Sequence, residues 1–258
     1  MTTMDAMSSQ SASEQAASAT LLEAEKLSAW YGAARILFDL DFNIQRGEVV
    51  AVMGRNGAGK STTFLSLMGM IERRSGAIRF MGRDILQSPS YRIAQMGLGF
   101  VPEDRRIFTD LTVAENLDIG RQAPRHWPDG TPLHTWTIEE LYEIFPNLAE
   151  RKNHGAGRMS GGEQQMLTIA RSLMGNPYLL LLDEPSEGVA PVIVEQMAKM
   201  IFQLKKAGVS ILLSEQNVHF ARYVSDRVYM LEKGHVTWSG SMDELTRNPD
   251  ISLKYLSI

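Results

Sequence analysis

A glycine-rich stretch directly after a short apolar run constrains this chain more than any other feature. The apolar run is Val49–Met53, and residues 54–62 read Gly-Arg-Asn-Gly-Ala-Gly-Lys-Ser-Thr. The spacing matches G-x-x-x-x-G-K-[ST], the phosphate-binding P-loop, which requires a strand before it and a helix after it. The apolar run predicts that strand, and a helical apolar pattern follows at once. This context favours nucleotide binding over an ordinary strand-to-helix turn with a solvated lysine.

The residue types in this loop suit a triphosphate. Glycines let successive backbone N–H groups turn toward a phosphate without Cβ clashes, and the next helix presents its positive end to the same anion. Lys60 is expected to reach the β- and γ-phosphates of ATP, and the Ser61 hydroxyl to take one position on Mg²⁺. The loop residues predicted to bind ATP are Gly54, Asn56, Gly57, Ala58, Gly59, Lys60, Ser61 and Thr62.

The composition narrows the class of protein. The 258 residues are 44% hydrophobic, which suits one large α/β domain over residues 21–258. The net charge of -4 argues against a broad nucleic-acid surface, and the absence of cysteine excludes disulfides and thiolate sites. No apolar run reaches the roughly 20 residues that span a bilayer, so any membrane role is expected to be peripheral. Residues 1–20, rich in Ser and Ala without a basic residue, predict a disordered tail rather than a signal peptide.

The rest of the chain predicts strands and helices in alternation. The helix after the P-loop is expected to end near Ser75 and Gly76, and Pro191 to begin a helix that ends at Gly208. A largely helical region is expected at 112–173, and Ser241 should cap the last helix. The predicted strands are 21–27, 36–44, 49–53, 78–81, 98–101, 178–182, 209–213, 227–231 and 235–239.

Carboxylates stand at the ends of two predicted strands. Asp183 and Glu184 follow the apolar run 178–182, which reads as a strand of a parallel sheet covered on both faces, and Glu103 follows the strand 98–101. Adjacent carboxylates at the end of a buried strand are costly when they have no partner. A Mg²⁺ ion and a water to activate are therefore favoured over a solvated turn.

The residue types alone allow two interpretations for each of three features. The aromatic ring of Tyr31 either fills the core, which its residue type favours, or stacks on a nucleotide base. Ser160 either forms a capping box or opens a second helix whose N-terminus faces a phosphate. His126 and His134 lie in the polar loop 122–136 and are conceivable metal ligands, although the absence of a supporting Cys or carboxylate cluster favours a surface loop.

The order of these motifs resembles that of ABC-type ATPases. In detail it is similar to the ATP-binding subunits of branched-chain amino-acid ABC importers, particularly the LivF-like one, over about residues 21–258. The resemblance implies an α/β P-loop NTPase with a mostly parallel core sheet, an N-terminal antiparallel β subdomain and a helical subdomain inserted at about 104–175. The supporting stretches are 55–60, 101–106, 159–165, 186–191 and 215–217.

The resemblance also implies roles for individual residues. Two copies, or one copy and a related ATPase, would face each other head to tail, so that ATP lies between one P-loop and the partner's Ser160, Gly161 and Gly162. Tyr31 would stack on adenine, which reverses the preference from residue type alone. Asp183 would hold Mg²⁺ through water, and Glu184 would be the general base. By the same resemblance, the catalytic residues are expected to be Glu184, Gln216 and Lys60, and the metal site is expected at Ser61, Asp183 and Glu103.

Three positions depart from the commonest ABC pattern. Glu103 stands in place of a glutamine that senses Mg²⁺ and the transmembrane partner, Gln216 in place of a histidine, and Ala190 in place of an aspartate. A glutamine donates a neutral hydrogen bond but carries neither a proton nor a charge. The rate and symmetry of hydrolysis are therefore open.

The implied partners are integral membrane permease subunits and, indirectly, a periplasmic or extracellular solute-binding protein, with no nucleic acid. The chain is then expected in the cytoplasm, on the inner face of the cell membrane. The solute stays open between branched-chain amino acids, urea, amides and aromatic acids. A soluble ABC protein that uses ATP as a clamp without a transporter is the alternative, and a non-catalytic nucleotide-binding module is a third.

Overall fold

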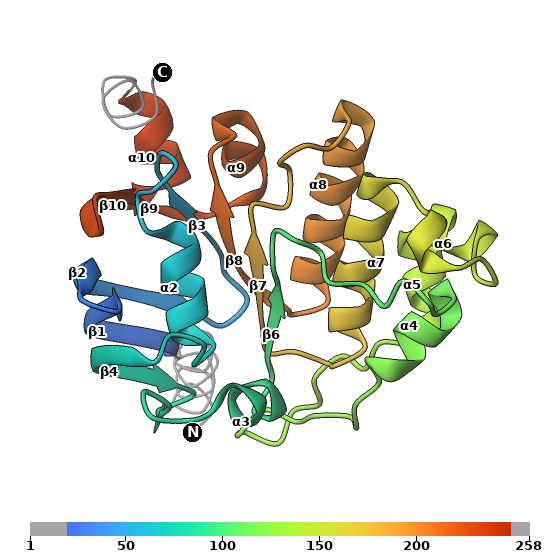
Figure 1. Ribbon diagram of the computed structural model, residues 1–258, viewed down its shortest axis with the longest axis horizontal. Coiled ribbons are helices and arrows are strands. Elements are labelled where there is room, and N and C mark those ends of the chain that lie inside the picture. Colours follow the sequence, from blue (N-terminus) through green and yellow to red (C-terminus); the bar gives the residue numbers. More distant parts are fainter. Residues whose placement is uncertain (1–19, 249–258) are drawn as a thin grey trace, which may run out of the picture.

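Two β-sheets enclose the helix that follows the P-loop. The computed structural model describes residues 20–248, and Figure 1 shows the antiparallel sheet at one end, the core sheet in the middle and a group of helices at the other end. The antiparallel sheet has the order β2-β1-β4-β5. Its strands are β1 (Thr20–Tyr31), β2 (Ala34–Gln45), β4 (Arg73–Phe80) and β5 (Arg83–Asp84).

The core sheet has the order β10-β9-β3-β8-β7-β6. Neighbouring strands are parallel throughout except for β10, which pairs antiparallel with β9 at the edge. The strands are β3 (Val49–Met53), β6 (Leu98–Val101), β7 (Leu179–Asp183), β8 (Ser210–Glu215), β9 (Arg227–Glu232) and β10 (His235–Ser241). Every residue of β3, β7 and β8 is buried, as expected for parallel strands that are covered on both faces.

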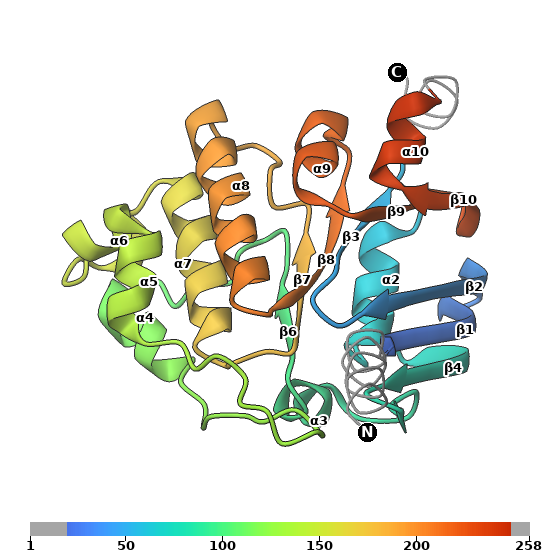
Figure 2. The ribbon, with the colours of Figure 1, turned by 180° about the vertical axis from the view of Figure 1, so that it is seen from behind.

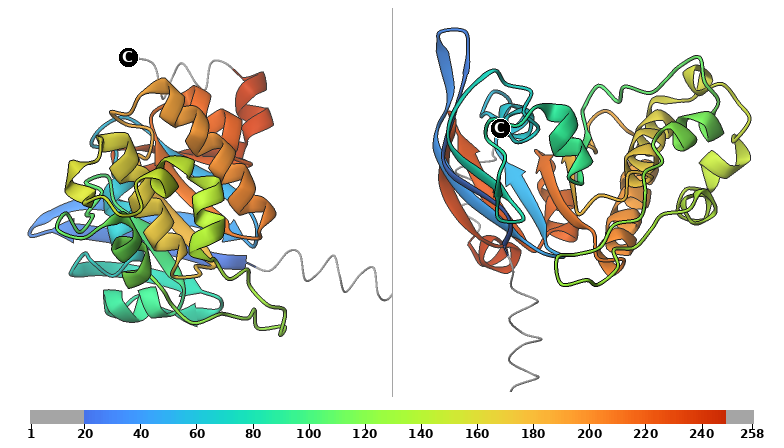
Figure 3. Two further views of the ribbon diagram at one scale, coloured as in Figure 1. Left: turned by 90° about the vertical axis from the view of Figure 1, so that its right-hand side faces the viewer. Right: turned by 90° about the horizontal axis from the view of Figure 1, so that it is seen from below.

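The helices divide between the core and an inserted group. The inserted group, α4 to α7, lies far from the antiparallel sheet in Figure 1, in the reverse view of Figure 2 and in the view from below in Figure 3. The helices are α2 (Lys60–Leu67), α3 (Ser90–Gln95), α4 (Val113–Ile119), α5 (Ile138–Ile144), α6 (Pro146–Glu150), α7 (Gly161–Leu173), α8 (Pro191–Lys206), α9 (Val218–Val224) and α10 (Met242–Arg247), with a 3-10 turn at Ala156–Arg158. The predicted fold class is confirmed.

Capping residues begin several helices where the sequence predicts them. Thr112 and Glu115 form a reciprocal capping box at α4, and Ser241 and Glu244 form another at α10. Pro191 begins α8, which ends two residues before Gly208. Within residues 20–248, no helix is both long and apolar enough to cross a bilayer.

Two boundary predictions are wrong. The helix after the P-loop ends at Leu67 rather than near Ser75 and Gly76, because Gly69 takes a left-handed φ of 71° and the chain turns back into β4. Thr20, predicted as the last residue of the tail, begins β1 and pairs with Gln45. The remainder of the predicted tail lies outside the described residues.

The loop at 122–136 is anchored to the core by aromatic and charged contacts. Trp127 is buried, and the guanidinium of Arg46 lies 3.9 Å from its ring centroid. Arg46 also pairs with Asp129 at 2.9 Å. His134 lies 3.2 Å from a carboxylate oxygen of Glu140. The loop is therefore packed against the turn between β2 and β3 as well as against its own helices.

Candidate functional site

Glycine is required at three places in the P-loop for different steric reasons. Gly57 and Gly59 have φ values of 78° and 109°, which L side chains rarely adopt. A Cβ at Gly59 would also lie 2.8 Å from a methyl carbon of Leu37, and one at Gly54 would overlap the carbonyl oxygen of Leu231. Ala58 is buried beside them, and its carbonyl accepts the N–H of Gly234 at 2.8 Å. The loop backbone is thus free to surround a small anion.

Lys60 is buried at the start of α2 with its ammonium group fully engaged. It is 3% exposed, and Nζ donates to the carbonyl oxygens of Gly54 at 2.9 Å and Arg55 at 3.2 Å. Nζ also lies 2.9 Å from Oε1 of Glu184. A buried ammonium requires such partners, because desolvation without them is costly. The P-loop lysine and the carboxylate after β7 therefore face one another.

Asp183 ends β7 between two hydroxyl groups. Its Oδ1 accepts hydrogen bonds from Ser214 Oγ at 2.6 Å and from Ser61 Oγ at 3.3 Å. Burial raises the pKa of Asp183, and the hydrogen bonds from Ser214 and Ser61 oppose that rise. The predicted metal residues Ser61 and Asp183 are thus adjacent, and Ser214 sets the orientation of the carboxylate.

Glu184 occupies a strained position at the centre of the site. Its φ is 44°, which is uncommon for a residue with a side chain. Its N–H donates to Ser214 Oγ at 2.9 Å, and its Oε2 accepts from Gln216 Nε2 at 2.7 Å. Gln216 Nε2 also donates to Asn56 Oδ1 at 2.7 Å. The amide of Gln216 therefore links the P-loop to Glu184.

The carboxyl groups of Glu184 and Glu187 have opposite pKa shifts. Burial alone would raise the pKa of Glu184, but hydrogen bonds from Glu187, Lys60 and Gln216 outweigh it and hold the pKa below its ordinary value. Hydrogen bonding to Glu184, together with burial and the charges of Glu184 and Glu103, raises the pKa of Glu187 to about 7. Glu184 is therefore ionised at neutral pH.

A cavity of about 470 Å³ gathers most of the predicted nucleotide site. Tyr31 lines it and is 51% exposed, so the preference for core filling from its residue type is wrong. Glu103 also lines it, as do Ile36 and Glu187, which the sequence did not suggest. The remaining lining residues are Asn56, Gly57, Gly59, Lys60, Ser61, Thr62 and Glu184.

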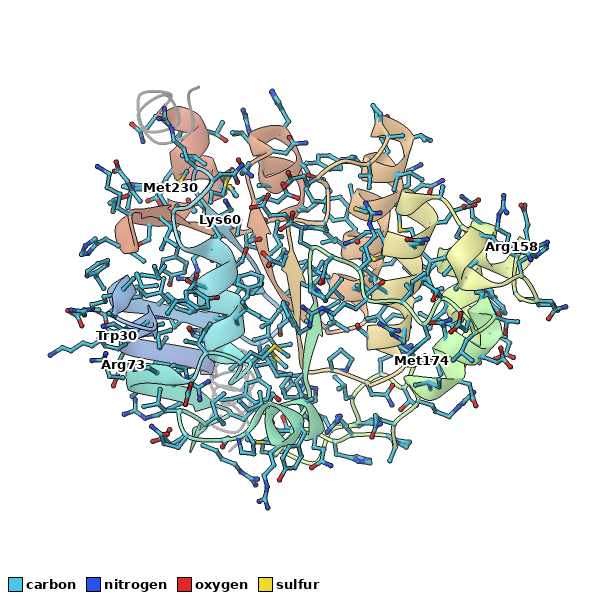
Figure 4. All side chains as sticks on the ribbon, viewed as in Figure 1. Trp30, Lys60, Arg73, Arg158, Met174 and Met230 are labelled. Atoms are coloured by element: carbon cyan, nitrogen blue, oxygen red, sulfur yellow. The ribbon has the colours of Figure 1, made fainter. Side chains whose placement is uncertain are left out.

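The second predicted phosphate-facing segment does not line this cavity. Ser160 caps α7 through a reciprocal box with Glu163, in which the N–H of Ser160 donates to Glu163 Oε2 at 2.8 Å. Figure 4 labels Lys60 and Arg158, two residues before Ser160, in well separated parts of the molecule. Gly161 lies against the guanidinium of Arg105. The P-loop and the segment Ser160, Gly161 and Gly162 are therefore not brought together within one chain.

Ser214 and Glu215 adjoin this site; the sequence placed them at the same sheet edge as Glu184 but assigned them no role. Both are buried at the carboxyl end of β8, and Glu215 accepts hydrogen bonds from Ser186 Oγ at 2.9 Å and from the N–H of Asn217 at 3.2 Å. Polar residues that close an apolar strand next to the P-loop strand were the available signal. Ala190, the third departure from the ABC pattern, is the N-cap residue of α8 and offers it no side-chain hydrogen bond.

A family model described as ABC transporter matches residues 37–187, which contain the P-loop, the Ser160 segment and the Asp183–Glu184 pair. This chain belongs to the ABC transporter family. It is an ATPase subunit of the ABC type, so ATP is its substrate.

Curated relatives of this ABC ATPase come from more than one transport system. The high-affinity branched-chain amino acid transport ATP-binding protein BraG of Pseudomonas aeruginosa is 42% identical over 236 residues, which are 92% of this chain and 99% of the relative. The probable branched-chain amino acid transport ATP-binding protein LivF of Archaeoglobus fulgidus is 35% identical over 87% of this chain and 94% of its own. The lipopolysaccharide export system ATP-binding protein LptB of Haemophilus influenzae is 33% identical over 92% and 97%.

Solved structures share the fold over nearly the whole chain. A nucleotide-free ATP-binding cassette from an ABC transporter superposes with a TM-score of 0.77 at 25% identity, covering 93% of this chain and 98% of the other. An ATP-binding subunit of an ABC transporter gives a TM-score of 0.73 at 29% identity, covering 90% and 94%. The resemblance inferred from the sequence motifs is confirmed.

Proposed function

We propose that this ABC ATPase powers an importer of branched-chain amino acids or a related small solute, and that residues Lys60, Asp183, Glu184 and Gln216 carry the hydrolysis. The observation that supports these roles most directly is the contact network at the cavity edge. Lys60 and Gln216 both bind Glu184, and Gln216 also binds Asn56 in the P-loop. The proposed base is thus tied directly to the phosphate-binding loop.

The residues present fit a Mg²⁺ ion that is held partly by phosphate. Ser61 Oγ and Asp183 Oδ1 lie 3.3 Å apart, while residues 20–248 contain no group of three or more His, Asp or Glu side chains that could hold a metal alone. Mg²⁺ typically takes one or two carboxylates and completes its octahedron with water and substrate phosphates. Ser61 and Asp183 would hold the ion there, with Glu103 at the cavity wall. The ion would neutralise charge on the phosphates.

The protein's own groups then prepare the attack of water on the γ-phosphate. Lys60 would exchange its contacts with Gly54 and Arg55 for phosphate oxygens, where its charge offsets developing negative charge. Glu184 is ionised and would accept the proton of the water as general base. Gln216 holds the Glu184 carboxylate by a neutral hydrogen bond, which fits a role in orientation and excludes proton transfer by Gln216 itself. Tyr31, exposed at the same cavity, would stack on adenine.

A second chain completes the site in this proposal. The cavity lacks any contribution from Ser160, Gly161 or Gly162, although these residues form a capped helix start that suits an anion. In a head-to-tail dimer, with a second copy or a related ATPase, this segment would meet the γ-phosphate held by the partner's P-loop. Each chain then carries two complementary halves.

A hollow beside Glu103 supports docking of a permease subunit. It measures about 520 Å³ and lies between the core and the inserted helices, and it includes Pro102 next to Glu103. Met70, Phe108 and Ile119 line it and are 45%, 47% and 54% exposed. An exposed apolar surface of this kind is typical of a protein interface. A permease segment seated here would hold the ATPase at the inner face of the membrane and couple it to transport, with a solute-binding protein acting indirectly.

The amino-acid solute class rests on the relatives. The amino-acid transport proteins reach 42% and 35% identity, and the lipopolysaccharide export protein reaches 33%. We therefore favour import of a branched-chain amino acid or a related amide, urea or aromatic acid. A deletion strain that takes up each of these solutes at the wild-type rate would contradict the importer assignment.

The catalytic assignment has its own test. Glu184→Gln keeps the size of the side chain but removes its basicity, so the purified variant should bind MgATP and fail to turn it over. Glu244→Gln, in the capping box of α10, is a matched control that should retain turnover. Undiminished ATPase activity of the Glu184 variant would exclude Glu184 as the base.

A further inference from the structure

Glu215 is a buried carboxylate outside the cavity. It is the last residue of β8, is 2% exposed and does not line the space assigned to the nucleotide. Its Oε1 accepts the N–H of Ser186 at 3.1 Å. Its Oε2 accepts Ser186 Oγ at 2.9 Å and the N–H of Asn217 at 3.2 Å. These partners are neutral donors, and no ion pair of Glu215 occurs among residues 20–248.

A carboxylate in this position has a free-energy cost that an apolar residue would avoid. Every residue of β3 and β8 is buried. The residue of β3 that pairs with Glu215 is the apolar Met53. Burying a charged group is unfavourable unless hydrogen bonds replace its water. Three hydrogen bonds do so here, which ties the position of Glu215 to the two chain segments that donate them.

Both of those segments carry a residue of the proposed catalytic site. Ser186 follows Glu184 by two residues, within a turn that the N–H of Glu187 closes onto the carbonyl of Glu184 at 3.1 Å, and Glu184 itself has a φ of 44°. Asn217 follows Gln216 directly, and the side chain of Gln216 donates to Glu184 Oε2 and to Asn56. Glu215 therefore joins the backbone after Glu184 to the backbone around Gln216, although the two segments lie about 30 positions apart in the sequence.

We propose that Glu215 is a positioning residue for ATP hydrolysis, which holds the segment after Glu184 and the segment around Gln216 in fixed register through Ser186 and Asn217. The inference rests on the proposed role of Glu184 as the base. The hydrogen-bond partners of Glu215 are Ser186 and Asn217, and neither of them lines the cavity. None of these three bonds involves the proposed metal residue Asp183. Its removal should therefore impair the placement of the base rather than the binding of nucleotide.

The variant Glu215→Gln tests the proposal with little change in shape. The amide NH₂ of glutamine would replace one of the two carboxylate oxygens. It would then face the N–H of Ser186 in one orientation and the N–H of Asn217 in the other, so at least one hydrogen bond is replaced by a contact between two donors. We expect kcat of the full chain to fall about tenfold or more, with the KM for MgATP changed by less than about threefold. Glu244→Gln is the matched control, because Glu244 also accepts a backbone N–H, at 2.8 Å from Ser241, but caps α10.

A second measurement separates positioning from a general loss of stability. Hydrogen exchange in nucleotide-free protein should accelerate about tenfold or more at the amides of Ser186 and Asn217 and stay unchanged in α4 to α7. Ser186→Ala, which removes one of the three hydrogen bonds, should lower kcat less. In the double variant, kcat should fall by less than the product of the two single decreases, because both substitutions disrupt the same contact between Ser186 and Glu215.

Three results would overturn the proposal: an unchanged kcat, a rise in KM that accounts for the whole loss of kcat/KM, or faster exchange throughout the domain. If Glu215→Gln does not fold, Ser186→Ala carries the same test, and an unchanged kcat and unchanged exchange at Asn217 in that variant would overturn it. Failure of the proposed function is distinct. Turnover by Glu184→Gln would exclude Glu184 as the base. Hydrogen exchange at Ser186 and Asn217 would still report whether Glu215 holds the two segments.

Discussion

Replacement of Ser214 by alanine should destabilise the fold by a measurable and specific amount. The hydroxyl is fully buried, donates to Asp183 Oδ1 at 2.6 Å and accepts the N–H of Glu184 at 2.9 Å. Without it, the one side-chain hydrogen bond left to Asp183 among residues 20–248 is the longer one from Ser61, at 3.3 Å, while the N–H of Glu184 retains the carbonyl oxygen of Ser214 at 3.2 Å. The dominant loss is one hydrogen bond to a buried carboxylate, which contributes about 2 kcal/mol.

Urea denaturation of wild type, Ser214→Ala and Ser225→Ala measures this difference. Ser225 is a matched control, because its hydroxyl oxygen is buried and has no hydrogen-bond partner among residues 20–248. The free energy of unfolding should fall by about 2 kcal/mol for Ser214→Ala and change by less than about 0.5 kcal/mol for Ser225→Ala. Equal effects of the two substitutions would refute the stabilising role assigned to the Ser214 hydroxyl.

Two further predictions concern a titrating carboxyl and an exposed surface. The pKa of Glu187 is about 7 in the folded chain against an ordinary 4.5, so its contribution to stability is present below the lower value and lost as the pH rises through the higher one. The unfolding free energy of Glu187→Gln should therefore rise relative to wild type between acidic and mildly alkaline buffer, and a constant difference would contradict this. Ile119→Arg in the 520 Å³ hollow should abolish co-purification with permease subunits and leave the ATPase rate of the purified chain within about twofold, whereas Tyr223→Arg on α9 should change neither. Retained co-purification of the Ile119 variant would exclude that hollow as the docking site.

Local pattern was sufficient for the half of the site that is contiguous in sequence. The apolar run Val49–Met53, the glycines and Lys60 predict the strand, the loop and the start of α2, and all three are confirmed. The end of α2 was missed, because Met68 and Ile71 continue the apolar periodicity although Gly69 turns the chain. Both residues are buried, so the apolar pattern predicted their burial correctly. It predicted the length of the helix wrongly, because α2 ends at Leu67.

The contacts that join distant segments could not be read from the sequence. The pairing of Lys60 with Glu184 and of Gln216 with Asn56 depends on the order of the strands in the sheet, which places β3 beside β8 and β8 beside β7. Tyr31 illustrates the same limit, since residue type favours burial and only the position at the end of β1 makes it line the cavity. Glu187 gave no signal at all, because its altered pKa arises from Glu184 in the folded chain.

We propose that one chain carries two complementary halves of an ATP site rather than a complete one. The P-loop half gathers around Lys60 in the cavity, while Ser160 opens α7 elsewhere in the molecule. Lys60→Ala damages the first half and Ser160→Ala the second. A head-to-tail dimer of the two variants therefore contains one intact site and one that is doubly damaged.

Mixing the two purified variants tests whether the two halves of one ATP site lie on different chains. Each variant alone should hydrolyse ATP poorly, and an equal mixture should recover up to about a quarter of the wild-type rate, because half of randomly formed dimers carry one intact site of two. If Ser160→Ala alone matches the wild-type rate and mixing adds nothing, each chain holds a complete site and the proposed division between two chains is wrong.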